Sequence, residues 1–470
     1  MSKRNFTILI IVLAIILIAI FGFLFLHRLA PAPQTPGTGI NFVSQFNPPG
    51  QNNTITPPST TPPSNTPVTE PPVVAPALQL VKVSSMPVAG FTVFQKERYK
   101  VLPVAIPATI PTPAGVGTPT ASVGATPPVT TPPATTSKTK TKTVVVKPTP
   151  PPTEFVPALR YVARTNGNIY ETFADSINEL QFSTTVVPKV HESFFGNNGN
   201  SVLMRYLNTD GATIDTFAGT LPTELLGGDT TSNTQVKGSF LPENITDMSV
   251  SSDGSKIFYL LNVNTGDSVV GITSGLLGDK KVQIFDSPFT EWLSQWPSAK
   301  MITLTTKPSS LVPGYMYMIN PDTKNLTRVL GGINGLTTLT SPDGKSVLYA
   351  GGNLSLDIYN ISTGNVTPVS VRTMPEKCVW GSASTTVYCA VPKAIGNATY
   401  PDDWYKGEVS FSDDFWKIDA ASGTGTMIFD PTTIRGGQSI DGIKLALDTG
   451  EKYLFFVNKK DSYLWELSLQ

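Results

Sequence analysis

A short repeated unit in the C-terminal part of the chain constrains the fold more than any other feature of the sequence. Each copy starts with a turn built from Gly, Asn, Asp or Ser and continues with two strands of alternating apolar residues. The clearest copy is the Ser-Pro-Asp-Gly-Lys turn at 341–345, followed by strands that end at Ala350 and Asn360. Because Asp-Gly suits a tight turn between antiparallel strands, we predict a protein of repeated antiparallel strands.

Six copies of this unit can be counted. Their turns lie at 196–199, 252–254, 296–299, 342–344, 381–384 and 448–450. A spacing of about 40 to 65 residues fits four-stranded propeller blades with loop insertions. The Asp-Gly carboxylates Asp253 and Asp343 are expected to serve the turns, and Trp292 and Trp296 to lie in the core between blades.

A seventh blade depends on a short segment, residues 77–102, between two proline-rich stretches. Strands between Arg160 and Ser183 read as a blade that lacks its first strand, and the chain ends at Gln470 without a last strand. Residues 81–84 would supply the outermost strand of the final blade, and residues 88–94 the first strand of the opening one. We therefore predict an all-β, seven-bladed β-propeller, closed by pairing its two ends. Six blades is the alternative, if residues 77–102 are only a linker.

The repeats at 251–256 and 341–345 each lead into a strand that ends in Tyr, and they resemble TolB-type and WD-like propeller repeats. The resemblance covers roughly residues 78–470, although the Gly-His and Trp-Asp pairs of WD repeats are absent. Residues 287–296, together with 314–317, are also similar to membrane-anchored bacterial propellers of unknown function. The resemblance implies a propeller at a bacterial surface and no particular activity.

The N-terminal part predicts a membrane anchor. Residues 6–26 form a long apolar run after Lys3 and Arg4, enough for a single transmembrane helix. Residues 1–5 would then be cytoplasmic, and the propeller would lie outside the cytoplasmic membrane. The alternative is a cleaved signal peptide, but Pro31 makes the Ala-Pro-Ala at 30–32 a poor cleavage site.

The domain plan follows from these elements. Residues 27–76 are a Pro/Thr-rich linker, residues 103–153 a second Pro/Thr-rich, disordered insertion, and residues 154–470 the main part of the propeller. The bilayer, contacted by residues 6–26, is one predicted partner.

Composition narrows the remaining partners and chemistry. Lys plus Arg and Asp plus Glu are 34 each, so a nucleic-acid partner is not expected. Two His and two Cys in the whole chain limit metal and nucleophilic chemistry, and we expect no cofactor and no metal ion. His191 is expected to have a structural role, because no nucleophile motif accompanies it.

Cys378 and Cys389 flank the turn at 381–384 and would pair across a hairpin. Directly opposed positions bring Cα atoms to about 4.5 to 5.5 Å, within reach of a disulfide. We predict a structural disulfide, which an oxidising location outside the membrane would permit. Free buried thiols are the alternative.

A long loop, residues 394–414, holds the candidate binding residues on the propeller rim. They are Tyr400, Asp402, Asp403, Trp404 and Tyr405. Aromatic side chains with carboxylates suit a glycan or peptide partner, whereas the ligand spacing of a calcium loop is missing. The alternative is a solvated loop without a ligand.

The function expected from these features is binding or scaffolding of a protein, peptide or glycan in the bacterial envelope, without enzymatic activity. The alternative is a propeller hydrolase or lyase that acts on cell-wall polymer. Carboxylates or His191 converging on the central channel would favour the enzyme, because propeller enzymes place catalytic groups there.

Overall fold

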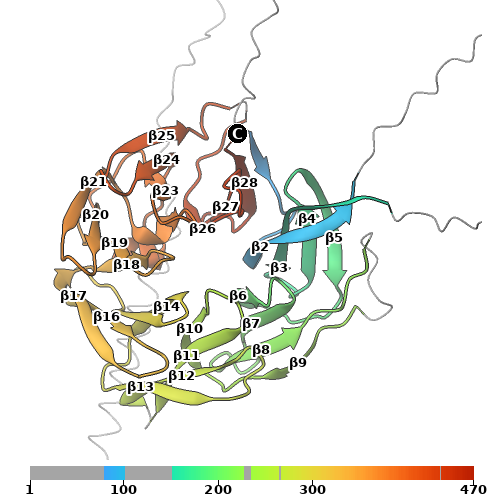
Figure 1. Cartoon of the computed structure of the whole chain (residues 1–470), viewed down its shortest axis with the longest axis horizontal. Coiled ribbons are helices and arrows are strands. Elements are labelled where there is room, and N and C mark those ends of the chain that lie inside the picture. Colours follow the sequence, from blue (N-terminus) through green and yellow to red (C-terminus); the bar gives the residue numbers. More distant parts are fainter. Residues whose placement is uncertain (1–78, 101–150, 227–233, 264–265, 435, 470) are drawn as a thin grey trace, which may run out of the picture. The chain divides into compact units, whose positions relative to one another are not determined.

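The computed structural model describes residues 79–100, 151–226, 234–263, 266–434 and 436–469. These residues form seven four-stranded antiparallel sheets, arranged as blades around a ring (Figure 1). The predicted seven-bladed all-β propeller is confirmed, and the six-bladed alternative is wrong. Helical structure in the described ranges is limited to short segments such as α2 (Asp402–Lys406) and the 3₁₀ turn η2 (Pro375–Lys377).

The blades are numbered here along the chain. Blade 1 contains β2 (Val88–Tyr99), β3 (Thr153–Ala163), β4 (Ile169–Phe173) and β5 (Ser176–Ser183). Blade 2 contains β6 (Val190–Gly196), β7 (Ser201–Leu207), β8 (Ile214–Thr220) and β9 (Lys237–Phe240). Blade 3 contains β10 (Ile245–Val250), β11 (Lys256–Val263), β12 (Ser268–Gly275) and β13 (Val282–Ser287). Blade 4 contains β14 (Trp292–Ser298), β15 (Met301–Thr306), β16 (Pro313–Ile319) and β17 (Leu326–Asn334). Blade 5 contains β18 (Thr337–Thr340), β19 (Ser346–Ala350), β20 (Ser355–Asn360) and β21 (Val366–Arg372). Blade 6 contains β22 (Cys378–Trp380), β23 (Thr386–Pro392), β24 (Asp413–Asp419) and β25 (Gly425–Phe429). Blade 7 contains β26 (Gly442–Leu447), β27 (Tyr453–Asn458), β28 (Leu464–Ser468) and β1 (Leu80–Lys82).

The repeated turns use their polar side chains internally. The Ser341 hydroxyl donates to Asp343 Oδ1 at 2.6 Å, and Asp343 Oδ1 accepts the Lys345 N–H at 3.1 Å. Gly344 has φ of +69°, a conformation that glycine adopts without strain. The turn at Asp253 repeats these contacts with Ser251 and Ser255, so both carboxylates serve their turns as predicted.

The ring closes by pairing the two ends of the propeller. β1 pairs with β28, so that Leu80 lies opposite Leu467, and β2 then opens blade 1. Beyond β1, Val83 N donates to Leu464 O at 2.8 Å, and Leu464 N donates back to the Ser84 hydroxyl at 3.0 Å. Leu464 and Leu467 are fully buried at this seam. The segment before the second proline-rich stretch is therefore part of the ring.

The core lies between neighbouring blades. Trp292 and Trp296 are buried together with Phe258, Leu260 and Ile302 of the adjacent strands. Their predicted place between blades is confirmed.

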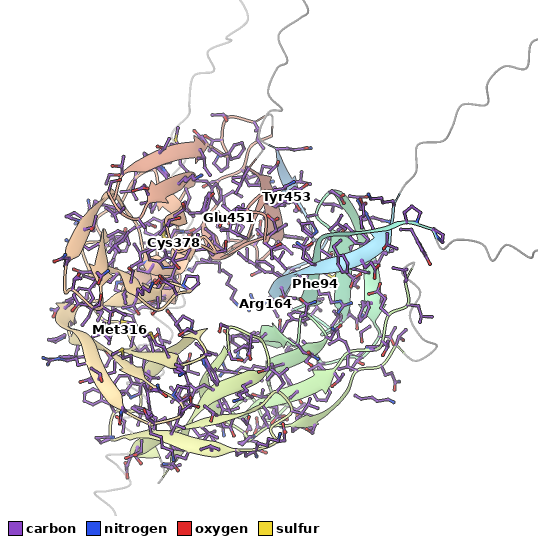
Figure 2. The ribbon with its side chains drawn as sticks, viewed as in Figure 1. Phe94, Arg164, Met316, Cys378, Glu451 and Tyr453 are labelled. Carbon is purple, nitrogen blue, oxygen red and sulfur yellow. A yellow bond between two sulfur atoms is a disulfide. The ribbon has the colours of Figure 1, made fainter. Side chains whose placement is uncertain are left out.

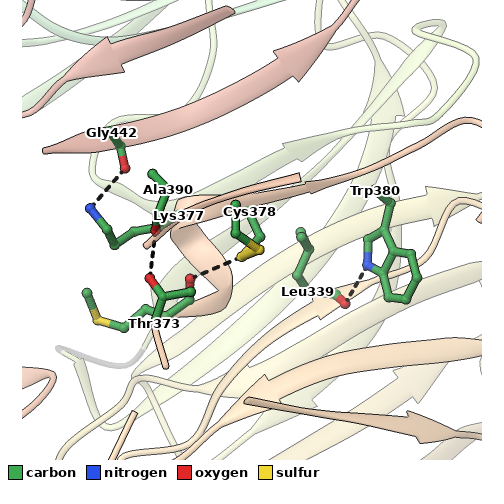
Figure 3. The surroundings of a disulfide bond; sticks show 9 residues. Leu339, Thr373, Lys377, Cys378, Trp380, Ala390 and Gly442 are labelled. Carbon is green, nitrogen blue, oxygen red and sulfur yellow. Dashed lines mark hydrogen bonds between the residues drawn. A yellow bond between two sulfur atoms is a disulfide. The ribbon is translucent and has the colours of Figure 1, made fainter. Parts of the chain in front are cut away.

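The disulfide is present. Cys378 of β22 lies directly opposite Cys389 of β23, with Cα atoms 4.1 Å apart, and both side chains are buried (Figure 3). The predicted pairing is confirmed.

The predicted transmembrane helix at 6–26 and the linker at 27–76 lie outside the described residues, as does most of the predicted insertion at 103–153. Within the described residues, no helix has the length and apolar character needed to cross a bilayer.

Glu466 in the closing blade provides a test of the fold by pH. Its side chain lies on β28 between Phe455 and Val81, is 4% exposed, and its Oε2 has no hydrogen-bond partner. Burial, with Asp175 and Asp448 nearby, raises the pKa of Glu466 to about 8. The folded state therefore holds this proton more tightly than the unfolded chain, where the pKa is about 4.5.

We expect the wild-type protein to lose stability as pH rises from about 4.5 through 8, and no further above that range. The pKa difference corresponds to at most about 5 kcal/mol. Glu466→Gln should remove this loss, so the stability of the variant relative to wild type should increase as pH rises. Chemical denaturation at pH 5, 7 and 9 measures the difference, and curves that stay parallel would contradict the assignment.

Candidate functional site in the central channel

Four neighbouring blades line a cavity at the centre of the ring. Their innermost strands are β26, β2, β6 and β10, which surround the central opening in Figure 1. The cavity has a volume of about 350 Å³. Its lining residues are Gly90, Phe91, Thr92, Glu192, Ser193, Phe194, Phe195, Val250, Lys444, Leu445 and Ala446. Charged side chains from different blades therefore meet in one space.

The charged groups gather where the inner strands begin. His191 and Glu192 are the second and third residues of β6, Asp247 is the third of β10, and Lys444 is the third of β26. Arg164, just after β3, reaches into the central opening (Figure 2). Together with the buried Arg205 of β7, these residues are called the channel mouth below.

Irregular strand pairing shapes the channel mouth. The register shifts between Val190 and Glu192 in β6, so that His191 is the extra residue, and it shifts again between Ile443 and Ala446 in β26. Lys444 has φ of +52°, in the left-handed region that non-glycine residues rarely adopt. β2 and β10 carry shifts at the same level. Such bulges redirect side chains and are common next to active sites.

One ion pair and two hydrogen bonds organise the mouth. Arg205 Nη1 donates to Glu192 Oε2 at 2.5 Å, and the two residues are direct partners across β6 and β7. Lys444 Nζ donates to the Ala89 carbonyl at 3.1 Å. Arg164 Nη1 donates to the Ser462 hydroxyl at 2.9 Å and remains largely exposed. Arg164 is thus a cation that a ligand in the central opening can reach.

The surroundings favour the uncharged forms of two basic groups. Desolvation by the surrounding protein lowers the pKa of Lys444, and Arg164 and Arg205 lower it further. The pKa of His191 is lowered by the same causes, desolvation first and then Arg205. Both side chains stay accessible to water in the channel. Both groups are therefore candidate bases, because a lowered pKa favours the uncharged form that accepts a proton.

Asp247 adds a carboxyl group on the blade 3 side. Its Oδ2 accepts the Ser294 N–H at 2.7 Å and the Ser294 hydroxyl at 2.6 Å. Burial raises the pKa of Asp247 to about 6 in spite of these hydrogen bonds. This group titrates close to neutral pH and fixes β14 against β10.

The structure changes the expectation for His191. The sequence predicted a structural histidine, but its imidazole is exposed at the channel mouth beside Arg164, Arg205 and Lys444. The sequence does not reveal Arg164, Arg205 and Lys444 as a group, because three different blades supply them. The only sequence signal was the expectation that catalytic groups of propellers face the channel.

The candidate rim residues are less available than expected. Tyr400 and Trp404 are 6% and 4% exposed, and they pack with Phe411 in a core of their own. Asp402 Oδ2 accepts the Ser310 N–H at 2.8 Å, and Asp403 Oδ2 accepts the Thr399 N–H at 2.7 Å. Tyr405 is 41% exposed. Ligand binding at this loop stays a prediction, and it would have to use Tyr405 instead of the two buried rings.

A buried ion cluster holds this loop to blades 6 and 7. Lys377 Nζ donates to Asp413 Oδ2 at 2.8 Å, to Asp441 Oδ1 at 2.5 Å and to Gly442 O at 3.1 Å (Figure 3 shows the last contact). All three ionic side chains are fully buried. Asp441 Oδ2 also accepts the Trp404 Nε1–H at 3.1 Å. The cluster is a structural tie, because no solvent reaches it.

No set of three or more His, Cys, Asp or Glu side chains in the described part of the chain is placed to hold a metal ion. The channel mouth carries two arginine cations, Arg164 and Arg205, which suit an anionic ligand better than a metal ion.

The likeness of this chain to known proteins is found among solved structures. No family model matches the chain, and no curated protein matches it. Similar solved structures include two oligogalacturonate lyases. One is oligogalacturonate lyase from Vibrio parahaemolyticus, with 11% identity, a TM-score of 0.42, and coverage of 66% of this chain and 85% of that one. The other is an oligogalacturonate lyase in complex with manganese, with 12% identity, a TM-score of 0.43, and coverage of 67% and 86%. TolB-type propellers are not singled out, so the resemblance holds only at the level of the propeller fold.

One expectation is corrected by this comparison. The sequence predicts a protein without enzymatic activity, whereas the two solved structures named above are enzymes. At 11% and 12% identity the likeness concerns the fold, and it transfers no residue role to this chain.

Proposed function

We propose that the channel mouth binds a carboxylate-bearing sugar chain and cleaves it by β-elimination, as a propeller-fold lyase. The observation that carries this proposal is the place of Lys444, a base of lowered pKa, in the lining of the central cavity, with the exposed Arg164 reaching into the central opening close enough to act on its charge. Elimination next to a carboxylate needs a base for the α-proton and positive charge to stabilise the developing carbanion. The channel mouth supplies both kinds of group.

In the proposed reaction, Arg164 binds the substrate carboxylate and the uncharged Lys444 amine takes the proton from the carbon next to it. The electron pair of that C–H bond forms a carbon–carbon double bond, while the C–O bond in the β position breaks. The departing oxygen takes a proton from water. No oxidant or reductant is required, and Lys444 returns its proton to solvent.

The test is turnover of an oligogalacturonate, chosen because each of its residues carries a carboxylate, followed by the ultraviolet absorbance of the unsaturated product. Lys444→Met should lower kcat by about a hundredfold or more, because a general base is lost. Arg164→Met should raise KM about tenfold, because one charge-assisted contact is lost.

Lys307→Met is the matched control. Lys307 is an exposed lysine that pairs with Glu291, and it is far from Lys444 and Arg164 in the sequence, so its loss should leave kcat and KM unchanged. Binding of the oligogalacturonate without any product would overturn the catalytic part and leave a sugar-binding module. No binding at all would overturn the whole proposal.

We also propose that the protein is displayed outside the cytoplasmic membrane of a bacterium. The support is the apolar run at 6–26, together with the disulfide between Cys378 and Cys389, which persists in oxidising compartments. β2 runs away from the channel mouth, so its last residue, Tyr99, lies on the opposite face of the ring. Leu80, the first residue of β1, lies on that same face, because it pairs with Leu467 near the end of β28. A ligand can therefore approach the mouth from the face that carries neither attachment point.

A further inference from the structure

Glu192 occupies a distinctive place in the channel mouth. It follows the bulge at His191, and it lines the same cavity as Lys444. The Glu192 side chain is 29% exposed, whereas its partner Arg205 is 7% exposed. The carboxylate is therefore held from behind by a buried cation and faces the channel.

Arg205 is committed to this arrangement. One nitrogen donates to Glu192 and another to the Ile245 carbonyl on the first residue of β10. Arg205 thus ties Glu192 to blade 3, and the carboxylate has little freedom to move away from the mouth. The register between Glu192 and Arg205 fixes the pair in the backbone as well.

Lys444 is surrounded by more positive than negative side chains. Arg164 from blade 1 and Arg205 from blade 2 are cations, and His191 of β6 is a base whose pKa is lowered by burial. The Ala89 carbonyl of β2 accepts the Lys444 hydrogen bond. Asp247 of β10 interacts with Glu192 and Arg205. Glu192 is the carboxylate whose charge acts on Lys444, and it opposes both arginines and the desolvation.

We infer that Glu192 is a positioning residue that sets the protonation state of Lys444 and thereby the pH range in which the channel mouth can act as a base. The catalytic part of this inference rests on the proposed function, but the effect of Glu192 on the protonation of Lys444 can be measured without turnover. A carboxylate held by a buried arginine gives a fixed negative potential that a mobile surface carboxylate would not give.

The experiment measures how fast an amine-modifying reagent labels Lys444 in the full-length protein as a function of pH, with peptide mass spectrometry as the readout. Only the uncharged amine reacts, so the labelling midpoint reports the protonation of Lys444. Glu192→Gln should move the midpoint to lower pH and increase labelling near pH 7 by about threefold or more. The acidic limb of the turnover profile should move in the same direction.

Glu291→Gln is the matched control, because Glu291 is an exposed carboxylate that pairs with Lys307. It should leave the Lys444 midpoint unchanged. Glu192→Gln could fail to fold, because it leaves Arg205 without its partner. Glu192→Asp is then the variant to use: it keeps the negative charge but holds it farther from Lys444, so the labelling midpoint should move to lower pH by a smaller amount.

An unchanged midpoint in a folded Glu192 variant would overturn the inference. If the midpoint moves but no substrate is turned over, the charge relation stands and the proposed lyase activity fails. If turnover is present and the midpoint does not move, Glu192 has only a structural role. The two proposals are thus separated by the same set of variants.

Discussion

Lys377→Met should cost about 3 to 5 kcal/mol of folding stability, the largest effect that we expect from a single substitution in this protein. The change leaves Asp413 and Asp441 buried without the cation that both of them contact. Uncompensated buried charge is among the most destabilising changes in proteins. Burial already raises the pKa of Asp413 to about 6 in the presence of Lys377. Thermal and chemical unfolding of the variant would measure the loss.

The matched control is the triple variant Lys377→Met, Asp413→Asn, Asp441→Asn, which removes all three charges together. It should recover a large part of the stability, because no ion then remains unpaired. A Lys377→Met variant as stable as wild type would show that solvent reaches the cluster, and the tie between the α2 loop and blade 7 would be wrong.

Removal of β1 should have the second large effect. A chain that starts at residue 85 lacks the strand that pairs with β28, together with Val83, which is 3% exposed. One buried valine contributes about 2 kcal/mol, and the lost ladder hydrogen bonds about 1 kcal/mol each, so we expect a loss of about 5 kcal/mol. The unpaired edge of β28 should also promote aggregation.

A chain that starts at residue 77 is the control, because it removes the N-terminal segment but keeps β1. Differential scanning calorimetry should show a cooperative transition for this control and a much lower transition temperature for the shorter chain. Equal transition temperatures would mean that the ring does not depend on this closure.

Most of the fold could be predicted because its signals are local. A Ser-Pro-Asp-Gly turn and the alternation after it are fixed by a few neighbouring residues, and the structure places Asp343 in its turn as expected. The pairing of Cys378 with Cys389 was equally local, since one hairpin carries both residues. The closure between β1 and β28 is not local, but a count of missing strands was enough to suggest it.

The site was harder to predict because its residues come from separate blades. Arg164, Arg205 and Lys444 become neighbours only when the ring closes, and the bulge that exposes His191 leaves no clear mark in the sequence. The candidate rim residues show the opposite problem. Tyr400 reads as a loop aromatic, but the loop folds back and stacks its ring on Phe411, with centroids 5.6 Å apart. Exposure within a long loop depends on such contacts, which periodicity does not report.

The most direct test of the proposed site is a crystal structure of the Lys444→Met variant with a bound oligogalacturonate. We predict one sugar carboxylate within hydrogen-bond distance of the Arg164 guanidinium, and its neighbouring C–H directed at the position that the Lys444 amine occupies in the wild type. A sugar chain bound only at Tyr405 on the rim, with an empty channel mouth, would contradict the account.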